Sequence, residues 1–252
     1  MLTSTYFSFK ERDMIPAAII IFITLVFFVA ERAVPGRELP EAPGWYGRAA
    51  LLNIAQLGIV LLAARYWNRW FQGSSMFQIS HIIPPPLAGF VAWFVGTFCF
   101  YWWHRGRHHF GPLWRIFHQV HHSPARIEMI TSFYKHPVEI IADSVLSSTL
   151  LFCLLGASPQ AAAWFNVYAV AGEYFYHSNL RTPHWVGYFL QRPEHHSIHH
   201  QLDVHKFNYG DITWWDRLFG TFRDTDEFAP ACGFPENHEA NLRRMIAFHD
   251  SY

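Results

Sequence analysis

Charged residues are scarce in this chain of 252 residues. Asp, Glu, Lys and Arg together make up 15% of the sequence, whereas soluble domains typically contain about 25%. The formal net charge is +0, so the chain lacks the basic excess typical of nucleic-acid-binding proteins, and we expect no nucleic-acid partner. Only three cysteines occur, Cys99, Cys153 and Cys232, and their spacing favours neither a disulfide framework nor a cysteine zinc site.

Several enzyme signatures are also missing. The chain has no His-Glu-x-x-His motif, which argues against a zinc metalloprotease, because no glutamate base lies between two paired histidines. It has no Gly-x-Gly-x-x-Gly fingerprint for a flavin or nicotinamide, and no His-Pro-Gly-Gly element of a fused cytochrome b5. A redox enzyme with this sequence would therefore take its electrons from a separate protein.

Apolar residues, in contrast, make up 51% of the chain and gather into runs. A membrane-spanning helix needs about 20 largely apolar residues, with about 17 at the short end. Five runs approach this length, namely Met14–Ala30, Ala49–Ala64, Ile82–Trp103, Ile140–Leu155 and Gln160–Tyr176. Because five such runs are difficult to bury without lipid, the sequence predicts an all-α fold, an integral-membrane helical bundle.

Histidine is also in excess, with 17 copies, of which 14 lie between His104 and His205. Three groups have helical spacing: His104 with His108, His118 with His121 and His122, and His196 with His199 and His200. Residues three and four apart share one face of a helix, and neutral imidazole binds Zn, Fe, Cu and Ni. Eight candidates exceed the four ligands of a closed zinc site, so we expect two metal ions.

The remaining histidines carry weaker signals. His109 directly follows His108 and so points away from the ligand face, while His195 and His205 adjoin the third group without matching its spacing. An isolated histidine is more often a surface or hydrogen-bonded core residue than a ligand. That is our interpretation of His81, His238 and His249, while His184, beside Pro183, is expected to lie in a loop.

The order of the apolar runs predicts where the histidines meet. If Ile82–Trp103 spans the membrane, the first two groups follow at its end, and Ile140–Leu155 then crosses away from that face. The chain would turn at Gly156-Ala157-Ser158-Pro159 and return along Gln160–Tyr176, so that all candidate ligands lie at one membrane face. Lys and Arg are more frequent after Trp103 than in the loop with Arg65 and Arg69, which would lie on the opposite side of the membrane. Because Lys and Arg tend to stay in the cytoplasm, we expect a helical metal-binding cap on the cytoplasmic face.

The three histidine groups, in this order and spacing, resemble the sterol desaturase / fatty acid hydroxylase superfamily. The resemblance covers about residues 90 to 224 and includes Asn208-Tyr209-Gly210 and Trp215-Asp216-Arg217-Leu218-Phe219-Gly220-Thr221. Family membership implies that two irons are held by His104, His108, His118, His121, His122, His196, His199 and His200, with His177 completing the set. His136 and His195 are further candidates, and Glu173, one turn before His177, could be a ligand or an acceptor that fixes a ring tautomer.

The resemblance also implies a function: a membrane-bound, non-haem di-iron enzyme that uses O2 and two electrons to hydroxylate or desaturate a lipid C–H bond. Zinc is an alternative occupant of the purified protein. The electrons would come from a separate ferredoxin or cytochrome b5-type donor, and Arg105, Arg107, Arg115 and Arg126 could dock it. We expect N-terminal membrane helices over 1–80, the hydroxylase-like domain over 81–224 and a C-terminal tail over 225–252.

Two other classes of protein remain open. A zinc-dependent lipid hydrolase would use the same ligands without O2. A metal-binding or transport protein is the other alternative, but transporters usually carry their coordinating residues near the membrane midplane, whereas these histidines lie at the ends of the runs. The substrate also stays open among fatty acyl chains, sterols, carotenoids and ether or amino lipids.

Overall fold

The computed structural model describes residues 11–66, 70, 71, 73 and 75–252. Within these residues the protein is all-α, as predicted, with two isolated β-bridges and no strand. The α-helices are α1 (Glu11–Ala33), α2 (Trp45–Arg65), α3 (Ile79–Ile82), α4 (Pro85–His109), α5 (Gly111–Leu113), α6 (Gln119–His122), α7 (Pro137–Ser148), α8 (Pro159–His177), α9 (Pro193–His199), α10 (Thr213–Leu218) and α11 (Leu242–Ile246). Two π-helical segments, η2 (Trp114–His118) and η4 (Thr149–Leu154), and three 3-10 segments, η3 (Met129–Thr131), η5 (His184–Tyr188) and η6 (Pro235–Asn241), complete the described elements.

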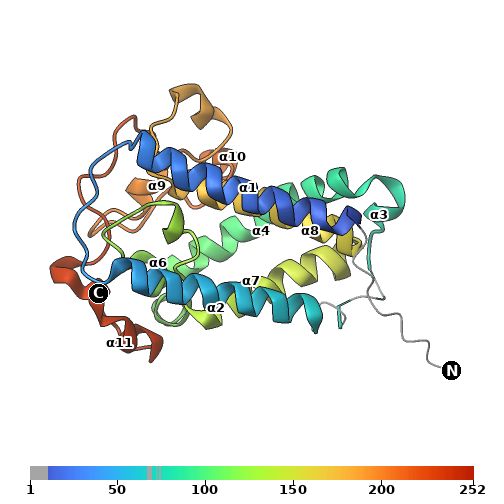
Figure 1. Cartoon of the computed structure of the whole chain (residues 1–252), viewed down its shortest axis with the longest axis horizontal. Coiled ribbons are helices and arrows are strands. Elements are labelled where there is room, and N and C mark those ends of the chain that lie inside the picture. Colours follow the sequence, from blue (N-terminus) through green and yellow to red (C-terminus); the bar gives the residue numbers. More distant parts are fainter. Residues whose placement is uncertain (1–10, 67–69, 72, 74) are drawn as a thin grey trace.

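Long helices form a bundle, and short ones cover one of its ends. Figure 1 shows α1, α2, α4, α7 and α8 lying roughly along the long axis, with α6, α9, α10 and α11 gathered at one end. The carboxyl ends of α4 and α8 and the amino end of α7 reach that same end. The chain therefore brings its histidine-rich segments to one end of the bundle.

Four of the long elements could cross a membrane by length and composition: Met14–Ala33, Trp45–Arg65, Pro85–His109 and Pro137–Leu154. Their outward faces expose large apolar side chains, such as Phe22 at 66% and Ile54 at 69%, as lipid contact requires. These helices support an integral membrane protein. The fifth expected span, α8, is not among the four: it carries Asn166, Glu173 and several tyrosines, and it packs along both α4 and α1.

Local sequence signals explain where the bundle helices begin. Pro85, Pro137 and Pro159 open α4, α7 and α8. Proline suits the first turn because a backbone N–H there has no partner within the helix, so its absence costs nothing, and because the fixed φ of proline is already helical. The Ser158 hydroxyl accepts a hydrogen bond from the backbone N–H of Ala161 at 3.2 Å and so caps α8. In the same way the His136 ring accepts from the N–H of Val138 at 3.0 Å and caps α7.

Two glycines allow the helices to approach and turn. A Cβ at Gly89 would lie 2.5 Å from the Cβ of Trp164, so only glycine lets α4 and α8 pack this closely. Gly156 has φ +63°, and a Cβ there would lie 2.2 Å from the carbonyl oxygen of Phe77. The turn predicted at Gly156-Ala157-Ser158-Pro159 is confirmed, since η4 ends at Leu154 and α8 begins at Pro159.

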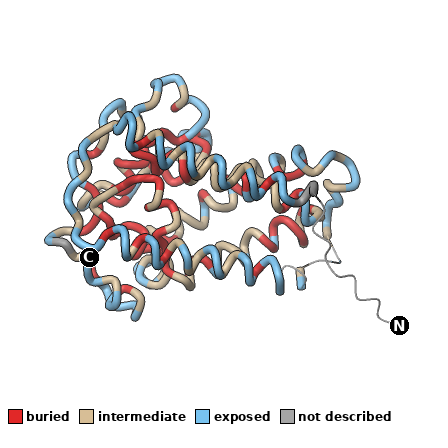
Figure 2. The backbone as a smooth tube through the Cα atoms, in the orientation of Figure 1, coloured by how far each residue is buried: buried red, intermediate tan, exposed pale blue. Residues whose placement is uncertain are grey.

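The buried residues form two main cores. One lies between α4, η4 and α8 and contains Ala88, Leu150 and Phe165. The other underlies the histidine end, where α2 meets α6 and residues of 225–252: Trp45 and Val120 pack there with Met245, which is fully buried. Figure 2 shows buried residues concentrated at this end, while the long helices expose their outward faces.

Candidate metal centre

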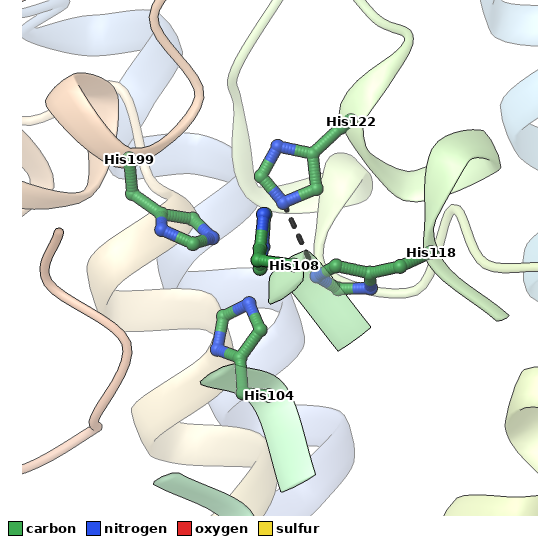
Figure 3. A group of neighbouring side chains, drawn as sticks. All are labelled: His104, His108, His118, His122 and His199. Atoms are coloured by element: carbon green, nitrogen blue, oxygen red, sulfur yellow. Dashed lines mark hydrogen bonds between the residues drawn. The ribbon is translucent and has the colours of Figure 1, made fainter. Parts of the chain in front are cut away.

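Nine histidines converge into two groups at this end of the bundle. Within each group, one ring nitrogen from each histidine lies within 4.8 Å of the corresponding nitrogens of the others. The first group, shown in Figure 3, takes two rings from α4 and one each from η2, α6 and α9: His104, His108, His118, His122 and His199. The second takes its rings from α6, α8, α9 and the residue that follows α9: His121, His177, His196 and His200.

Each group draws on both five-residue histidine motifs. In His118-x-x-His121-His122, the first and last rings join the first group and the middle ring joins the second. The motif His196-x-x-His199-His200 is divided in the opposite sense, because its middle ring, His199, joins the first group. Neighbouring residues therefore serve different groups, and the stacked rings of His122 and His200, with centroids 4.1 Å apart, connect the two.

Carbonyl and carboxylate oxygens fix the orientation of several rings. The Nδ1–H of His104 donates to the carbonyl oxygen of Tyr209 at 2.8 Å, and that of His199 to the carbonyl of Phe207 at 2.7 Å. Further Nδ1–H donors are those of His177 to the carbonyl of Glu173, His196 to Oε1 of Gln191 and His118 to Oε1 of Glu139. A carbonyl oxygen can only accept, so the proton is on Nδ1 and the Nε2 lone pair faces the centre of the group.

The inward nitrogens then lie close together without protons between them. The Nε2 atoms of His177 and His196 are 2.9 Å apart, although the Nδ1 atoms of both rings already donate elsewhere. In the first group, the Nε2 atoms of His104, His108 and His199 are buried without a hydrogen-bond partner. Two facing lone pairs repel each other unless a cation lies between them, so this donor set fits metal ions.

Burial keeps these imidazoles neutral. It lowers the pKa of His199 to about 3, and together with neighbouring rings it lowers the pKa values of His121, His122, His196 and His200 well below 6.5. Only a neutral imidazole offers a lone pair to a metal. At neutral pH the ligand atoms are therefore available without the release of a proton.

A family model described as fatty acid hydroxylase matches residues 89–221, which is just over half of the chain. The chain belongs to the fatty acid hydroxylase family. The match lies inside the segment 81–224 and includes the nine grouped histidines. The superfamily that the histidine spacing resembles is thereby confirmed.

Curated relatives carry names from lipid metabolism. The chain is 30% identical over 125 residues to the very-long-chain aldehyde decarbonylase GL1-9 of Oryza sativa subsp. indica. It is 30% identical over 128 residues to the sphinganine C4-monooxygenase 1 of Arabidopsis thaliana. Each of these two matches covers 48% of this chain and 48% of the relative. It is 28% identical over 238 residues to the alkylglycerol monooxygenase of Xenopus tropicalis, covering 85% of this chain and 50% of that protein. The chain thus spans about half the length of these relatives, and no solved structure matches it.

The structure places the other candidates of the sequence outside both groups. His136 caps α7 through Nδ1, and its Nε2 contacts the carbonyl oxygen of Ile246 at 3.2 Å. His195 contacts Oδ1 of Asp224 through Nε2 at 2.9 Å. Glu173 pairs with Lys135 at 2.9 Å, and its Oε2 lies 3.5 Å from Nδ1 of His177, so its carboxylate lies behind a ring of the second group.

One arginine proposed for donor docking is not on the surface. Arg107 is 4% exposed and forms an ion pair with Glu139. It is buried because Glu139, which also accepts from His118, lies inside the bundle and requires a cation beside it. Arg107 is therefore unavailable to a partner protein, whereas Arg115 remains exposed.

Sequence reasoning missed several residues that orient the rings. Helical spacing gives no sign that Glu139 contacts His118 or that Gln191 contacts His196. The position of His205 beside the third group does not fix its role in the sequence, but in the structure it is buried, and its Nδ1 lies 3.0 Å from Nδ1 of His122. The only available signal is that Glu139 and Gln191 lie near the histidine motifs. Three of the acceptors, behind His104, His177 and His199, are backbone carbonyls, which leave no mark in a sequence.

A cavity of about 730 Å³ adjoins both histidine groups. His104 and His118 of the first group line it, as do His121, His177 and His196 of the second. From there it extends between the membrane helices, where α1, α2, α4, α7 and α8 all contribute wall residues. The volume lies within the range of about 300–1,000 Å³ that small-molecule sites occupy.

Proposed function

We propose that this protein is a membrane-bound, non-haem di-iron oxygenase that hydroxylates or desaturates a lipid C–H bond with O2 and external electrons. The observation that carries the proposal is the cavity, because it joins five of the grouped histidines to the interior of the membrane helices. Family membership supports it, as do the names of relatives that are monooxygenases of sphinganine and alkylglycerol. In hydroxylation a C–H bond, O2, two electrons and two protons give C–OH and one water.

The protein's own residues would hold and orient the metals. The five Nε2 atoms of the first group and the four of the second are the ligand atoms we assign to two irons. Bound iron supplies the redox chemistry that activates O2. The hydrogen-bond acceptors behind His104, His118, His177, His196 and His199 fix those rings before a metal arrives, which lowers the cost of assembling the site.

The cavity would position the lipid and exclude water. Its walls bring a hydrocarbon chain from the membrane interior to the inward face of the rings, so that one C–H bond is held next to the metals. We place the histidine end at the cytoplasmic face as a helical cap, supported by the Lys and Arg bias of the sequence. We also propose a separate electron donor of the ferredoxin or cytochrome b5 type.

The test is oxygen incorporation by the purified protein in lipid nanodiscs. Loaded with Fe(II) and supplied with a reduced ferredoxin and 18O2, the protein should convert a lipid into a product that carries 18O. His199→Ala should abolish the product, while His109→Ala, an exposed ring in neither group, should leave it unchanged. Turnover under strict anaerobiosis would instead support a zinc-dependent lipid hydrolase, and full activity without metal would refute both.

A further inference from the structure

The cavity extends far enough along α8 to give a long occupant a direction. Along α8, the lining residues run from His177 back to Ala162. Fifteen residues of α-helix rise about 22 Å. An extended hydrocarbon chain can lie along this wall, and its two ends would then meet different side chains.

All charged side chains of the cavity wall lie at the histidine end. Among the described lining residues these are Arg107, Lys135, Asp143, Glu173 and Asp211. Further along α8 and its neighbours, the wall consists of apolar residues such as Leu151 and Phe165 and of uncharged polar ones such as Asn166. The polar end of a bound amphiphile therefore belongs beside the histidines, and its tail belongs in the bundle.

Both cations of the wall are already paired. Arg107 forms an ion pair with Glu139 and lies 3.8 Å from Asp143, and the Lys135 ammonium lies 2.9 Å from Oε1 of Glu173. An anionic head would have to compete with these carboxylates. Metal ions would add positive charge, but Glu139 and Glu173 lie directly behind His118 and His177 and offset part of it.

One carboxylate of the wall is left without a cation. Asp211 forms no ion pair with a described residue, and its Oδ1 accepts a hydrogen bond from the Tyr176 hydroxyl at 3.3 Å. The Tyr176 ring lies against the rings of His177 and His196, with centroids 4.9 and 4.7 Å away. Asp211 is thus a hydrogen-bond acceptor next to the second histidine group, suited to an O–H or N–H donor of a ligand.

The membrane imposes the same order of polarity. Lipids keep their heads at the surface and their tails in the hydrocarbon core, and the histidines lie at one end of the spanning helices. We propose that the cavity binds a single-chain lipid whose head carries hydroxyl or ammonium donors, with that head at Asp211 and Tyr176 and the tail along α8 toward Ala162. This inference rests on the proposed oxygenase function only for its chemical consequence, which is oxidation within the first few carbons from the head.

Photocrosslinking tests the orientation without catalysis. The full chain, loaded with redox-inert Zn(II) in nanodiscs, is irradiated with 1-O-alkylglycerols that carry a diazirine either near the glycerol or at the tail end. The head-proximal probe should label peptides that contain Tyr176 or Asp211, and the tail-end probe should label those that contain Ala162 or Leu151. The reversed pattern, or labelling of outer faces alone, would overturn the proposal.

Competition for the same crosslink tests the head chemistry. An alkylglycerol and a long-chain amino alcohol should each block labelling at a concentration at least tenfold lower than a fatty acid or a lysophosphatidic acid of equal tail length. Asp211→Asn should weaken the amino alcohol about tenfold, whereas Glu227→Gln, the same change at an exposed ion pair, should not. Equal or stronger competition by the anionic lipids would refute the head assignment.

The two proposals fail in distinguishable ways. If the crosslinks follow the expected pattern but iron-loaded protein forms no 18O-labelled product, the oxygenase function is wrong and the lipid site stands. If labelled product forms with oxygen in the middle or at the end of the tail, the oxygenase stands and the proposed orientation is wrong.

Discussion

Metal retention by single and double histidine variants tests the division of the motifs most directly. His121 and His122 are adjacent in the chain but belong to different groups, whereas His121 and His200 are 79 positions apart and belong to the same one. If each group holds one ion, His121→Ala and His122→Ala should each lose a different ion. The two double variants should then differ. The variant with His121→Ala and His200→Ala should keep one ion, and the variant with His121→Ala and His122→Ala should keep none.

The size of the effect follows from the ligand numbers. Structural sites with four ligands bind Zn²⁺ with a free energy of about 10–16 kcal/mol at neutral pH, which is roughly 3 kcal/mol per ligand. Removing one ligand should therefore weaken an ion about 10²-fold. The second group falls from four rings to three and the first from five to four, so the ion of the second group should be lost at the lower chelator concentration.

The assay is metal content after equilibration with a graded chelator, measured by mass spectrometry on protein in nanodiscs. His109→Ala is the matched control and should keep both ions, because that ring is exposed and lies in neither group. Circular dichroism checks that the helices persist in each variant. If the same-group double loses both ions, or the cross-group double keeps one, the assignment of rings to groups is wrong.

Three further predictions concern the surroundings of the site. Glu139→Gln should weaken the ion of the first group by about 10–100-fold in the same chelator assay, because Glu139 orients His118; an unchanged affinity would contradict this role. The metal-free protein should lose stability as the pH falls from 6.5 toward 4. Burial lowers the pKa of His199 to about 3 and that of His205 to about 4. In this pH range the unfolded chain therefore binds protons that the folded chain does not. Each of these two rings should lower the free energy of unfolding by about 2 kcal/mol at pH 5. Urea unfolding measures this free energy, and a value that does not change with pH would refute the prediction. Gly89→Val should destabilise the bundle by about 1–3 kcal/mol because it forces α4 from α8, whereas Gly58→Val, where an added Cβ meets nothing within 4 Å, should have little effect in the same thermal unfolding assay.

Helical spacing predicted which histidines come together but not how they divide. Residues three and four apart share a helix face, so His118, His121 and His122 were expected to lie near one another. Their assignment to different groups depends on which partners arrive from α4, α8 and α9, and spacing within one helix carries no such information. In addition, Trp114–His118 is π-helical and joins α6 at His118, so the regular helix assumed for this motif is interrupted at its first histidine.

The membrane runs were predictable for a different reason. A helix surrounded by lipid must be apolar on all sides, so the sequence marks α1, α2 and α4 plainly. α8 is weaker in this signal because one side lines the cavity with Asn166 and Glu173 while other sides pack on α4 and α1. The feature that made this helix ambiguous in the sequence is therefore the one that exposes polar groups to the cavity.

Arg107 illustrates the limit of reading charges without a fold. In the sequence it lies between Arg105 and His108 and resembles a surface cation. In the structure it is directed at Glu139, the residue that holds His118. An unpaired carboxylate at Glu139 would be costly to bury, and an unpaired guanidinium would be equally so. The pair and the ring it supports thus form one unit, and the basic residues available to an electron donor must be sought among those that remain exposed, such as Arg115.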